Sequence, residues 1–165
     1  MAPIVVPTPN TTITSAWGKS VADAINGAIP GEVFYNQITA PVLLTNGAAS
    51  AAQMVIAGSA TVYDGRPVIV EFSSPGILTP NAAGASVMLN LWDGNTDLGY
   101  FGQVLATSPQ IQVGATFRRR ITPTAGTHTY QIVGWRTVGG ASGTVQAGPG
   151  GIDQFCPAFL RIVRA

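Results

Sequence analysis

The amino-acid sequence predicts an all-β fold, an antiparallel jelly-roll β-sandwich, preceded by a short N-terminal arm and one short helix. Apolar and polar residues alternate with a period of two from about residue 32 onward, as they do in half-buried strands. Turn-forming residues interrupt the alternation at short intervals, and 20 glycines and 12 prolines make up about a fifth of the 165 residues. These observations favour a domain of many short strands.

The alternation is clearest in Ser86–Asp93, where Val87, Leu89 and Leu91 share one face. Turn signals such as Asp64-Gly65 separate such segments. Eight or nine short strands at this spacing indicate a sandwich or barrel, and the jelly roll is the commonest eight-stranded solution. The predicted strands are Val33–Ile38, Gln53–Tyr63, Pro67–Ser73, Ala85–Asp93, Leu98–Ala106, Val113–Thr122, Thr127–Thr137, Thr144–Ala147 and Ala158–Val163.

Residues 1–31 are predicted to form an arm and a helix for attachment or oligomerisation, and residues 32–165 form the sandwich. Three prolines without periodicity favour an extended arm over residues 1–12. A Ser or Thr N-cap, apolar residues at helical spacing and a Gly-Pro stop predict the helix that follows. Its apolar face packs either on the core or on sister chains, because about three turns are not stable alone in water. The attachment residues predicted here are Ile4, Val5, Val6, Trp17, Val21 and Ile25.

Charge is scarce and unevenly distributed. Only 9% of residues are charged, against roughly 25% in an average soluble domain, which suggests a surface covered by partner chains. Residues 1–97 hold two basic and six acidic side chains, whereas residues 98–165 hold six arginines and one acid. This asymmetry suits packing between copies or docking on an acidic surface. A single lysine disfavours nucleic acid as a partner, and no apolar run reaches the ~18 residues of a membrane span.

The sequence offers little for catalysis, and we expect neither an enzyme nor a cofactor. His128 is the only histidine, so one chain cannot form a two-histidine metal site, and its strand lacks a nucleophile elbow. The seven acids show no pairing typical of a glycosidase. Cys156 has no cation nearer in sequence than Arg161 and is expected to be a small buried residue. The lone cysteine and the absence of a signal peptide predict synthesis in a reducing cytoplasm.

Two loops resemble ligand loops but lack the residues that complete them. Asp93–Asp97 places oxygen ligands at alternate positions, as calcium loops do, yet Leu98 and Val104 stand where such loops have Gly and Glu. A hairpin turn explains this run, and a calcium ion is the alternative. The glycine-rich segment Gly139–Gly151 lacks a Gly-Lys-Ser/Thr signature and is predicted to be a mobile connection that flanks a short strand.

The run Arg118-Arg119-Arg120 is the most distinctive cluster of charge. On a strand, Arg118 and Arg120 share one face, and solvation explains them. Arg119 shares the other face with Phe117 and Ile121, where a cation needs a partner. We therefore predict that Arg119 forms an ion pair between subunits. A sugar or phosphate site is the alternative for the cluster.

Three segments carry a resemblance to a known family. Residues 12–23 (TITSAWGKSVAD) resemble the opening of many structural proteins of tailed bacteriophages, although Lys19 replaces the usual Asn. Residues 120–130 (RITPTAGTHTY), followed by Trp135, are similar to a hairpin of the jelly rolls on phage tails and heads. Residues 157–163 (PAFLRIV) are similar to the last strand of those jelly rolls.

The resemblance implies a virion protein with a TNF-like jelly roll, usually a homotrimer, in which the arm and helix join the particle. In such trimers one sheet edge and its aromatic residues face the threefold axis. The implied partners are other copies of the chain and virion proteins such as the major capsid protein or tail proteins. The short chain favours a knob that decorates the capsid exterior. The alternative is a minor tail protein whose loops bind a host receptor, for example a surface glycan.

Overall fold

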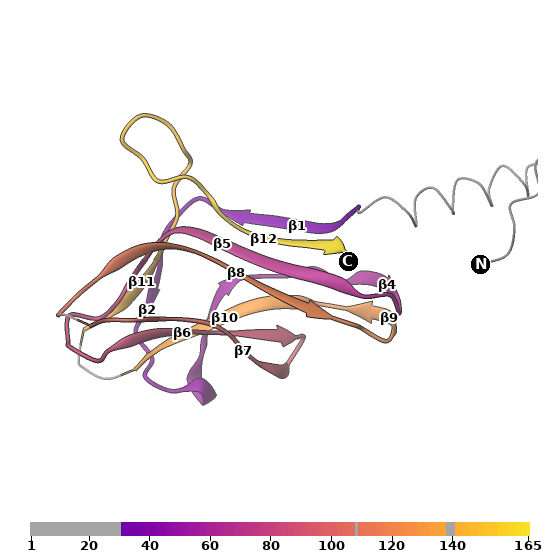
Figure 1. The fold of residues 1–165 in the computed structure, drawn as a ribbon, viewed down its shortest axis with the longest axis horizontal. Helices are drawn as coiled ribbons and strands as arrows, with labels where there is room; N and C mark the ends of the chain where they lie inside the picture. The colour runs from indigo at the N-terminus through magenta and orange to yellow at the C-terminus, as the bar shows by residue number, and fades with distance from the viewer. Residues whose placement is uncertain (1–30, 108, 138–140) are drawn as a thin grey trace, which may run out of the picture. The chain divides into compact units, whose positions relative to one another are not determined.

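The structure is a computed structural model that describes residues 31–165 except 108 and 138–140. The chain divides into two units, Met1–Gly31 and Glu32–Ala165. The predicted arm, the predicted helix and their six attachment residues therefore lie outside the described residues. The second unit is an antiparallel jelly-roll β-sandwich, which confirms the predicted fold class (Figure 1).

Twelve strands and one 3-10 turn make up the described part of the second unit. They are β1 (Glu32–Ile38), β2 (Val42–Leu44), η1 (Ala49–Ala51), β3 (Gln53–Ile56), β4 (Thr61–Asp64), β5 (Val68–Leu78), β6 (Ser86–Asp93), β7 (Thr96–Leu105), β8 (Gln112–Ile121), β9 (Ala125–His128), β10 (Tyr130–Thr137), β11 (Gly143–Gln146) and β12 (Ala158–Arg164).

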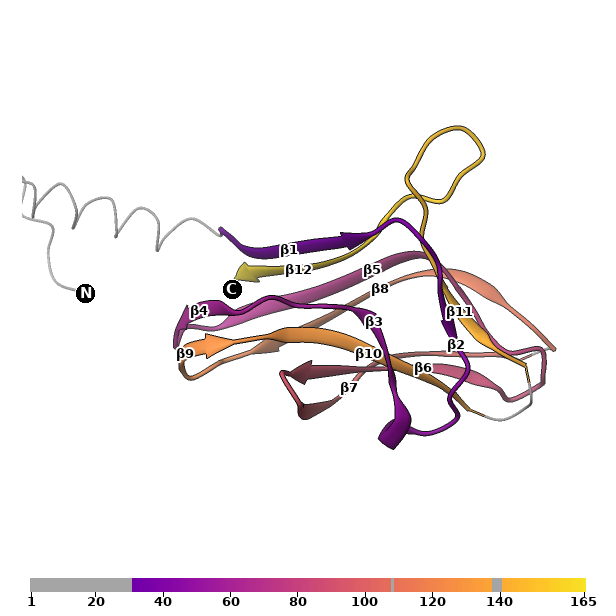
Figure 2. The same ribbon diagram turned by 180° about the vertical axis from the view of Figure 1, so that it is seen from behind.

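The strands form two main sheets. In the first sheet β1 pairs with β12, β12 with β5 and β5 with β8, while β11 and β2 continue the sheet beside the far half of β5. The second sheet has the order β3-β10-β6-β7, and the pair β4-β9 extends it at one end (Figure 2). Taking β1/β2, β3/β4, β9/β10 and β11/β12 as interrupted strands gives eight strands in the orders 1-8-3-6 and 2-7-4-5. These orders are those of an eight-stranded jelly roll.

The core lies between the two sheets and follows from the alternation in the sequence. Val68, Val70 and Phe72 of β5 are at most 1% exposed, and Leu89 and Leu91 of β6 are fully buried. Each such side chain contributes roughly 1.5–3 kcal/mol when it leaves water. Because neighbours along a strand point to opposite faces, the residues between these core positions lie on the outward faces of the sheets.

Two predicted strands are interrupted in the structure. The predicted strand Gln53–Tyr63 is broken into β3 and β4, and a Cβ atom on Gly58 in the break would lie 2.0 Å from the Tyr130 carbonyl oxygen. The predicted strand Thr127–Thr137 is likewise divided at Thr129 into β9 and β10. Both interruptions therefore lie next to the place where the Gly58 and Tyr130 backbones approach too closely for a side chain.

The first sheet also departs from prediction at β5 and β2. The predicted strand Pro67–Ser73 is longer in the structure: β5 continues through Pro75 and Gly76 to Leu78, with a register shift between Ser74 and Ile77. Such a bulge accommodates a proline inside a sheet. The strand β2 was not predicted, because three residues are too few to show a period. Within the described residues, no helix has the length and hydropathy that a membrane crossing requires.

Candidate functional site

The outward face of the first sheet brings together charged and aromatic side chains from four strands. We call it the arginine face, and it consists of three neighbouring rows that cross β1, β12, β5 and β8. The central row is Tyr35, Arg161, Glu71 and Arg118, flanked by Gln37, Phe159, Ser73 and Thr116 on one side and by Glu32, Val163, Ile69 and Arg120 on the other.

Glu71 is the centre of the arginine face. It is only 5% exposed, although it points away from the core. Arg118 donates from Nε to one carboxylate oxygen, and Arg161 donates from Nη2 to the other at 2.9 Å. The two arginine side chains stay 64% and 39% exposed. Charge-assisted bonds of this kind compensate the buried carboxylate and fix both guanidinium groups in place.

Aromatic rings and hydroxyl groups lie beside this cluster. Tyr35 stacks on Phe159 with ring centroids 5.9 Å apart, and the Arg161 guanidinium lies 5.9 Å from the Phe159 ring. Ser73 Oγ and Thr116 Oγ1 are 2.9 Å apart and share a hydrogen bond. The face therefore combines guanidinium groups, aromatic rings and hydroxyls on one rigid sheet.

The three consecutive arginines of β8 divide as the strand period predicts. Arg118 and Arg120 are exposed on the arginine face, and Arg120 has no hydrogen bond or ion pair within the described part of the chain. Arg119 points to the other face, where its Nη1 donates to the Leu98 carbonyl oxygen at 2.7 Å. Within this chain, Arg119 therefore binds a backbone carbonyl. The predicted ion pair of Arg119 with a carboxylate of a second subunit stays a prediction.

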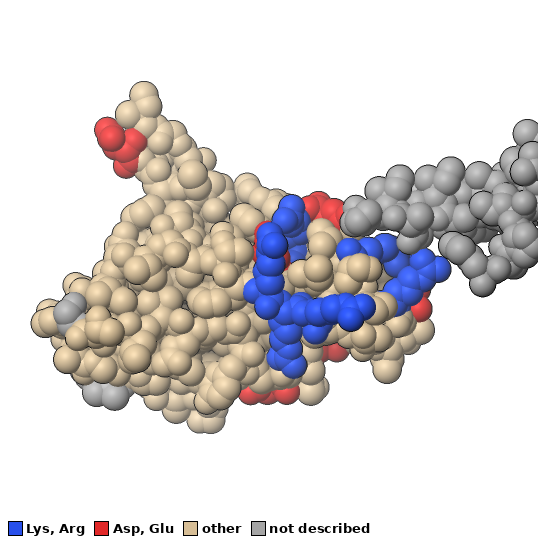
Figure 3. Space-filling model, viewed as in Figure 1, with Lys and Arg blue, Asp and Glu red and all other residues tan. Residues whose placement is uncertain are grey.

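Positive charge is concentrated at one end of the sandwich. Figure 3 shows arginines over one half of the visible face, while the described residues of the other half carry almost no charge. Asp64 pairs with Arg164 at 2.7 Å and with Arg66 at 3.5 Å. The hydrogen bond from Arg164 is the main cause that lowers the pKa of the Asp64 carboxyl. Asp64 and Glu71 pair with four arginines, so this end keeps an excess of positive charge.

Sequence reasoning missed Glu71 and Arg161 as members of the site. The available signal was an acidic residue inside an apolar strand, VIVEF, where an unpaired carboxylate would be unfavourable. Which arginine would reach Glu71 depends on strand register, because Arg118 and Arg161 lie 47 and 90 residues away in sequence.

A second polar cluster surrounds His128 at the joint between β9 and β10. Its Nδ1 lies 2.6 Å from Asp93 Oδ2, and its Nε2 lies 3.0 Å from the Thr124 carbonyl oxygen. Because both neighbours accept hydrogen bonds, the doubly protonated ring suits the site. The hydrogen bond with Asp93 is the main cause that raises the pKa of His128. Tyr130 stacks on the ring, and burial raises the pKa of Tyr130 to about 12.

The side chains of Asp93, His128 and Thr124 are arranged like a catalytic triad, but His128 cannot act as the general base. The Thr124 hydroxyl lies 3.2 Å from His128 Nε2. A general base must accept the hydroxyl proton at that nitrogen. The closer Thr124 carbonyl can only accept, so Nε2 carries a proton already. This contact was not predicted, and the arrangement fits a structural ion pair.

We expect the His128–Asp93 pair to stabilise the fold more at acidic than at alkaline pH. Because the pKa of folded His128 is raised, its contribution is complete below the unfolded pKa near ~6.5 and is lost as pH rises through the folded value. His128→Gln should cost about 1–2 kcal/mol at pH 6 and less at pH 8.5. Urea unfolding of both proteins at the two pH values measures this. An equal loss at both values would contradict the assignment.

The Asp93–Asp97 run forms a hairpin turn, as the preferred interpretation predicted. Asp93 pairs with Thr96 across the turn, and Gly94 has a φ of 54°. The Asp97 carboxylate accepts from Asn90 Nδ2 and from the Gly99 amide at 2.7–2.9 Å, and Asp93 accepts from His128 and Thr129. Both carboxylates are thus used by protein groups. The described residues contain no cluster of three metal-binding side chains.

Cys156 is exposed, so the prediction of a buried residue is wrong. It lies in a hairpin that projects from the sandwich between β11 and β12 (Figure 1). The amides of Gly148 and Gly150 donate to the carbonyls of Cys156 and Phe155 at 3.0–3.1 Å and order this segment. The part of Gly139–Gly151 that the structure describes therefore forms β11 and the start of a hairpin. Ile152 at its tip is 91% exposed.

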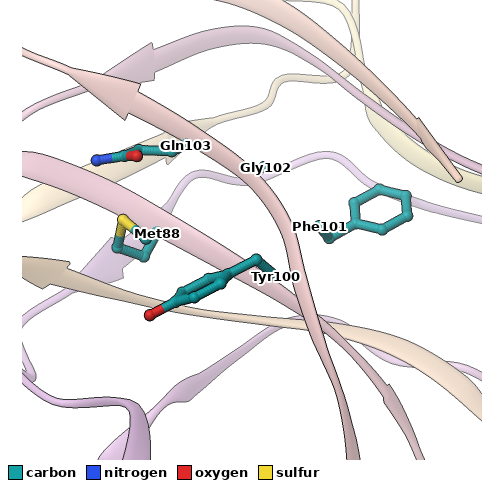
Figure 4. A pocket seen from close by; sticks show the side chains of 5 residues that line it. All are labelled: Met88, Tyr100, Phe101, Gly102 and Gln103. Carbon is teal, nitrogen blue, oxygen red and sulfur yellow. The ribbon is translucent and has the colours of Figure 1, made fainter.

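A hollow on the outward face of β6 and β7 is uncharged. Its volume is about 490 Å³, and Met88, Tyr100, Phe101, Gly102 and Gln103 line it (Figure 4). Tyr100 is 69% exposed and lies 6.1 Å from the ring of Trp135. Phe101 points away from Tyr100 toward the core. The hollow offers apolar contact but no charge, in contrast to the arginine face.

The fold and the arginine face define an all-β jelly-roll domain with one strongly charged sheet face. The sequence matches no protein-family model and no curated protein. Among solved structures, the chain is similar to a carbohydrate-binding module of lichenase 5A from Cellvibrio mixtus in complex with cellotriose. The two share 13% identity over 82% of this chain and 90% of that chain, with a TM-score of 0.37. A likeness of this degree carries no argument about function.

Proposed function

We propose that the protein is a structural protein of a tailed bacteriophage virion, a homotrimeric knob that decorates or stabilises the capsid exterior. Residues 1–31 attach the knob to the particle. The resemblance of three segments, residues 12–23, 120–130 and 157–163, to phage virion proteins supports this proposal. A non-enzymatic role agrees with the structural use of His128 and with the engagement of Asp93 and Asp97 by protein donors.

One observation carries the self-association. At the end of the sandwich opposite the arginine face, the visible surface has almost no charge (Figure 3), and this end exposes the large apolar side chains Leu43, Leu105 and Val113. Arg136 also lies at this end, where its Nε donates to the Thr45 carbonyl oxygen at 3.0 Å. Strand register places Leu43 in an outward row with Thr144, Leu78 and Gln112, whereas Val113 pairs with Ile77 and lies on the other face of the edge strand β8. Exposed apolar surface of this kind marks an interface. We assign this charge-poor end to the contacts between copies.

The alternative is a minor tail protein that binds a host receptor through its loops. The projecting hairpin favours this alternative, because its ordered backbone presents Ile152 and Phe155 to solvent. Specific binding to host cells that is lost on Ile152→Asp would support a receptor role.

We expect the full chain to sediment as a trimer. Leu43→Asp combined with Leu105→Asp should shift it to monomers, because three copies of each new carboxylate would be buried at the interface. Val62→Asp is the matched control, since Val62 is exposed on β4 at the arginine end and should not change the mass. A wild-type monomer at micromolar concentration would contradict self-association.

The position of the protein on the virion is tested by binding to isolated capsids and tails. The labelled full chain should bind empty capsids of its phage, and a chain without residues 1–29 should keep the sandwich and lose this binding. Labelling of tails alone would refute the capsid assignment and favour the minor tail protein.

A further inference from the structure

We propose that the arginine face is a binding site for an acidic polysaccharide, whose carboxylate or phosphate groups bind between Arg118 and Arg120. This site is separate from the charge-poor end that we assign to self-association. It therefore does not depend on the number of copies or on the position of the protein in the virion.

The first argument is that the buried carboxylate prepares the site. Glu71 holds Arg118 through its Nε, which leaves the terminal nitrogens of that guanidinium free for a second acceptor. Arg161 donates to Glu71 from Nη2, and its own Nε is buried without a partner within the described residues. Arg118, one of the two arginines that would bind the ligand, is thus fixed before a ligand arrives, which reduces the entropy lost on binding.

The second argument is the charge that remains. Arg118 and Arg120 are two residues apart on the same face of β8, roughly 7 Å along the strand. Arg120 has no carboxylate partner within the described part of the chain. Its row continues through Ile69 and Val163 to Glu32, which lies three strands away on β1. Guanidinium groups at this spacing can hold one carboxylate or phosphate between them in forked geometry.

The third argument concerns the rest of the ligand. The row next to Glu71 offers the Gln37 amide, the Ser73 and Thr116 hydroxyls and the Phe159 ring. Hydroxyls and amides both donate and accept hydrogen bonds, as sugar hydroxyls require. An inorganic anion held between Arg118 and Arg120 would not extend to this row, which lies on the other side of the Glu71 row. Nucleic acid fits less well, because the described residues contain no lysine.

The experiment measures binding of the full chain to polygalacturonate by calorimetry at low and at physiological salt. Neutral dextran, inorganic phosphate and single-stranded DNA are the comparison probes. Arg120→Gln should weaken polygalacturonate binding about tenfold, since one charge-assisted contact is lost. Arg120→Lys should weaken it less but measurably, because lysine keeps the charge and loses the fork. Arg136→Gln is the charge-matched control on β10 and should bind as the wild type does.

Each result decides the proposal. Saturable binding to polygalacturonate but not to dextran, with the loss at Arg120 and none at Arg136, supports it. Absence of binding, tighter binding to DNA, or equal losses at Arg120 and Arg136 would overturn it. Binding to inorganic phosphate as tight as to polygalacturonate would also overturn it, because the sugar contacts would then contribute nothing. The mass of the same samples reports on self-association independently.

Discussion

Replacing both Arg118 and Arg161 by alanine is expected to lower the free energy of unfolding by about 3–5 kcal/mol, because an unpaired buried carboxylate remains. Glu71 is only 5% exposed and receives one charge-assisted bond from each arginine. Either single replacement leaves one partner in place. Each should cost about 1 kcal/mol, since the arginine side chains are 64% and 39% exposed. The loss in the double variant should therefore exceed the sum of the single losses.

Urea unfolding of the wild type, both single variants and the double variant gives this coupling directly. Arg120→Ala on the same face is the control and should change the free energy of unfolding by at most about 0.5 kcal/mol. Glu71→Gln should cost less than the double variant, because the arginines that lose their partner already contact water. If the losses of the two single variants add up to that of the double variant, Arg118 and Arg161 do not jointly stabilise the buried Glu71 carboxylate.

Gly58→Ala is expected to destabilise the sandwich by about 3 kcal/mol or more, because the space next to Gly58 is filled by backbone. A Cβ atom at this position would lie 2.0 Å from the Tyr130 carbonyl oxygen and 2.8 Å from the carbonyl carbon. A flexible side chain could turn aside, but Tyr130 begins β10, which pairs with both β3 and β6. Relief of the clash must move the centre of the second sheet.

Gly47→Ala is the matched control, because nothing lies within 4 Å of the added atom. It should be neutral or stabilise the fold by up to about 1 kcal/mol, since alanine restricts the unfolded chain. Thermal unfolding of the two variants measures the difference. Equal melting temperatures would show that β3 and β10 separate there without cost.

The period of two in the sequence was sufficient to predict the jelly roll and most of its strands. Val87, Leu89 and Leu91 alternate with more polar neighbours, and all three are buried in β6. The β6–β7 hairpin also followed from local chemistry, because Asp93-Gly94-Asn95 favours a tight turn. These features depend on neighbours along the chain, which a sequence displays directly.

The period of two also predicted that Arg118 and Arg120 share one face of β8 and that Arg119 lies on the other. It did not predict the break at Gly58, which depends on the Tyr130 backbone 72 residues later in the sequence. It did not predict the exposure of Cys156 either, because the projection of that hairpin depends on bonds from Gly148 and Gly150. Contacts between distant segments have no local pattern.

What the sequence alone determined is the fold class, the low charge and the asymmetric distribution of arginines. Only the tertiary structure decided that Glu71 lies between Arg118 and Arg161, and that Arg120 is left without a carboxylate beside them. The physical reason is that strand register, set by the packing of the core, aligns β12, β5 and β8. A shift of one residue in either register would turn these side chains to the opposite face.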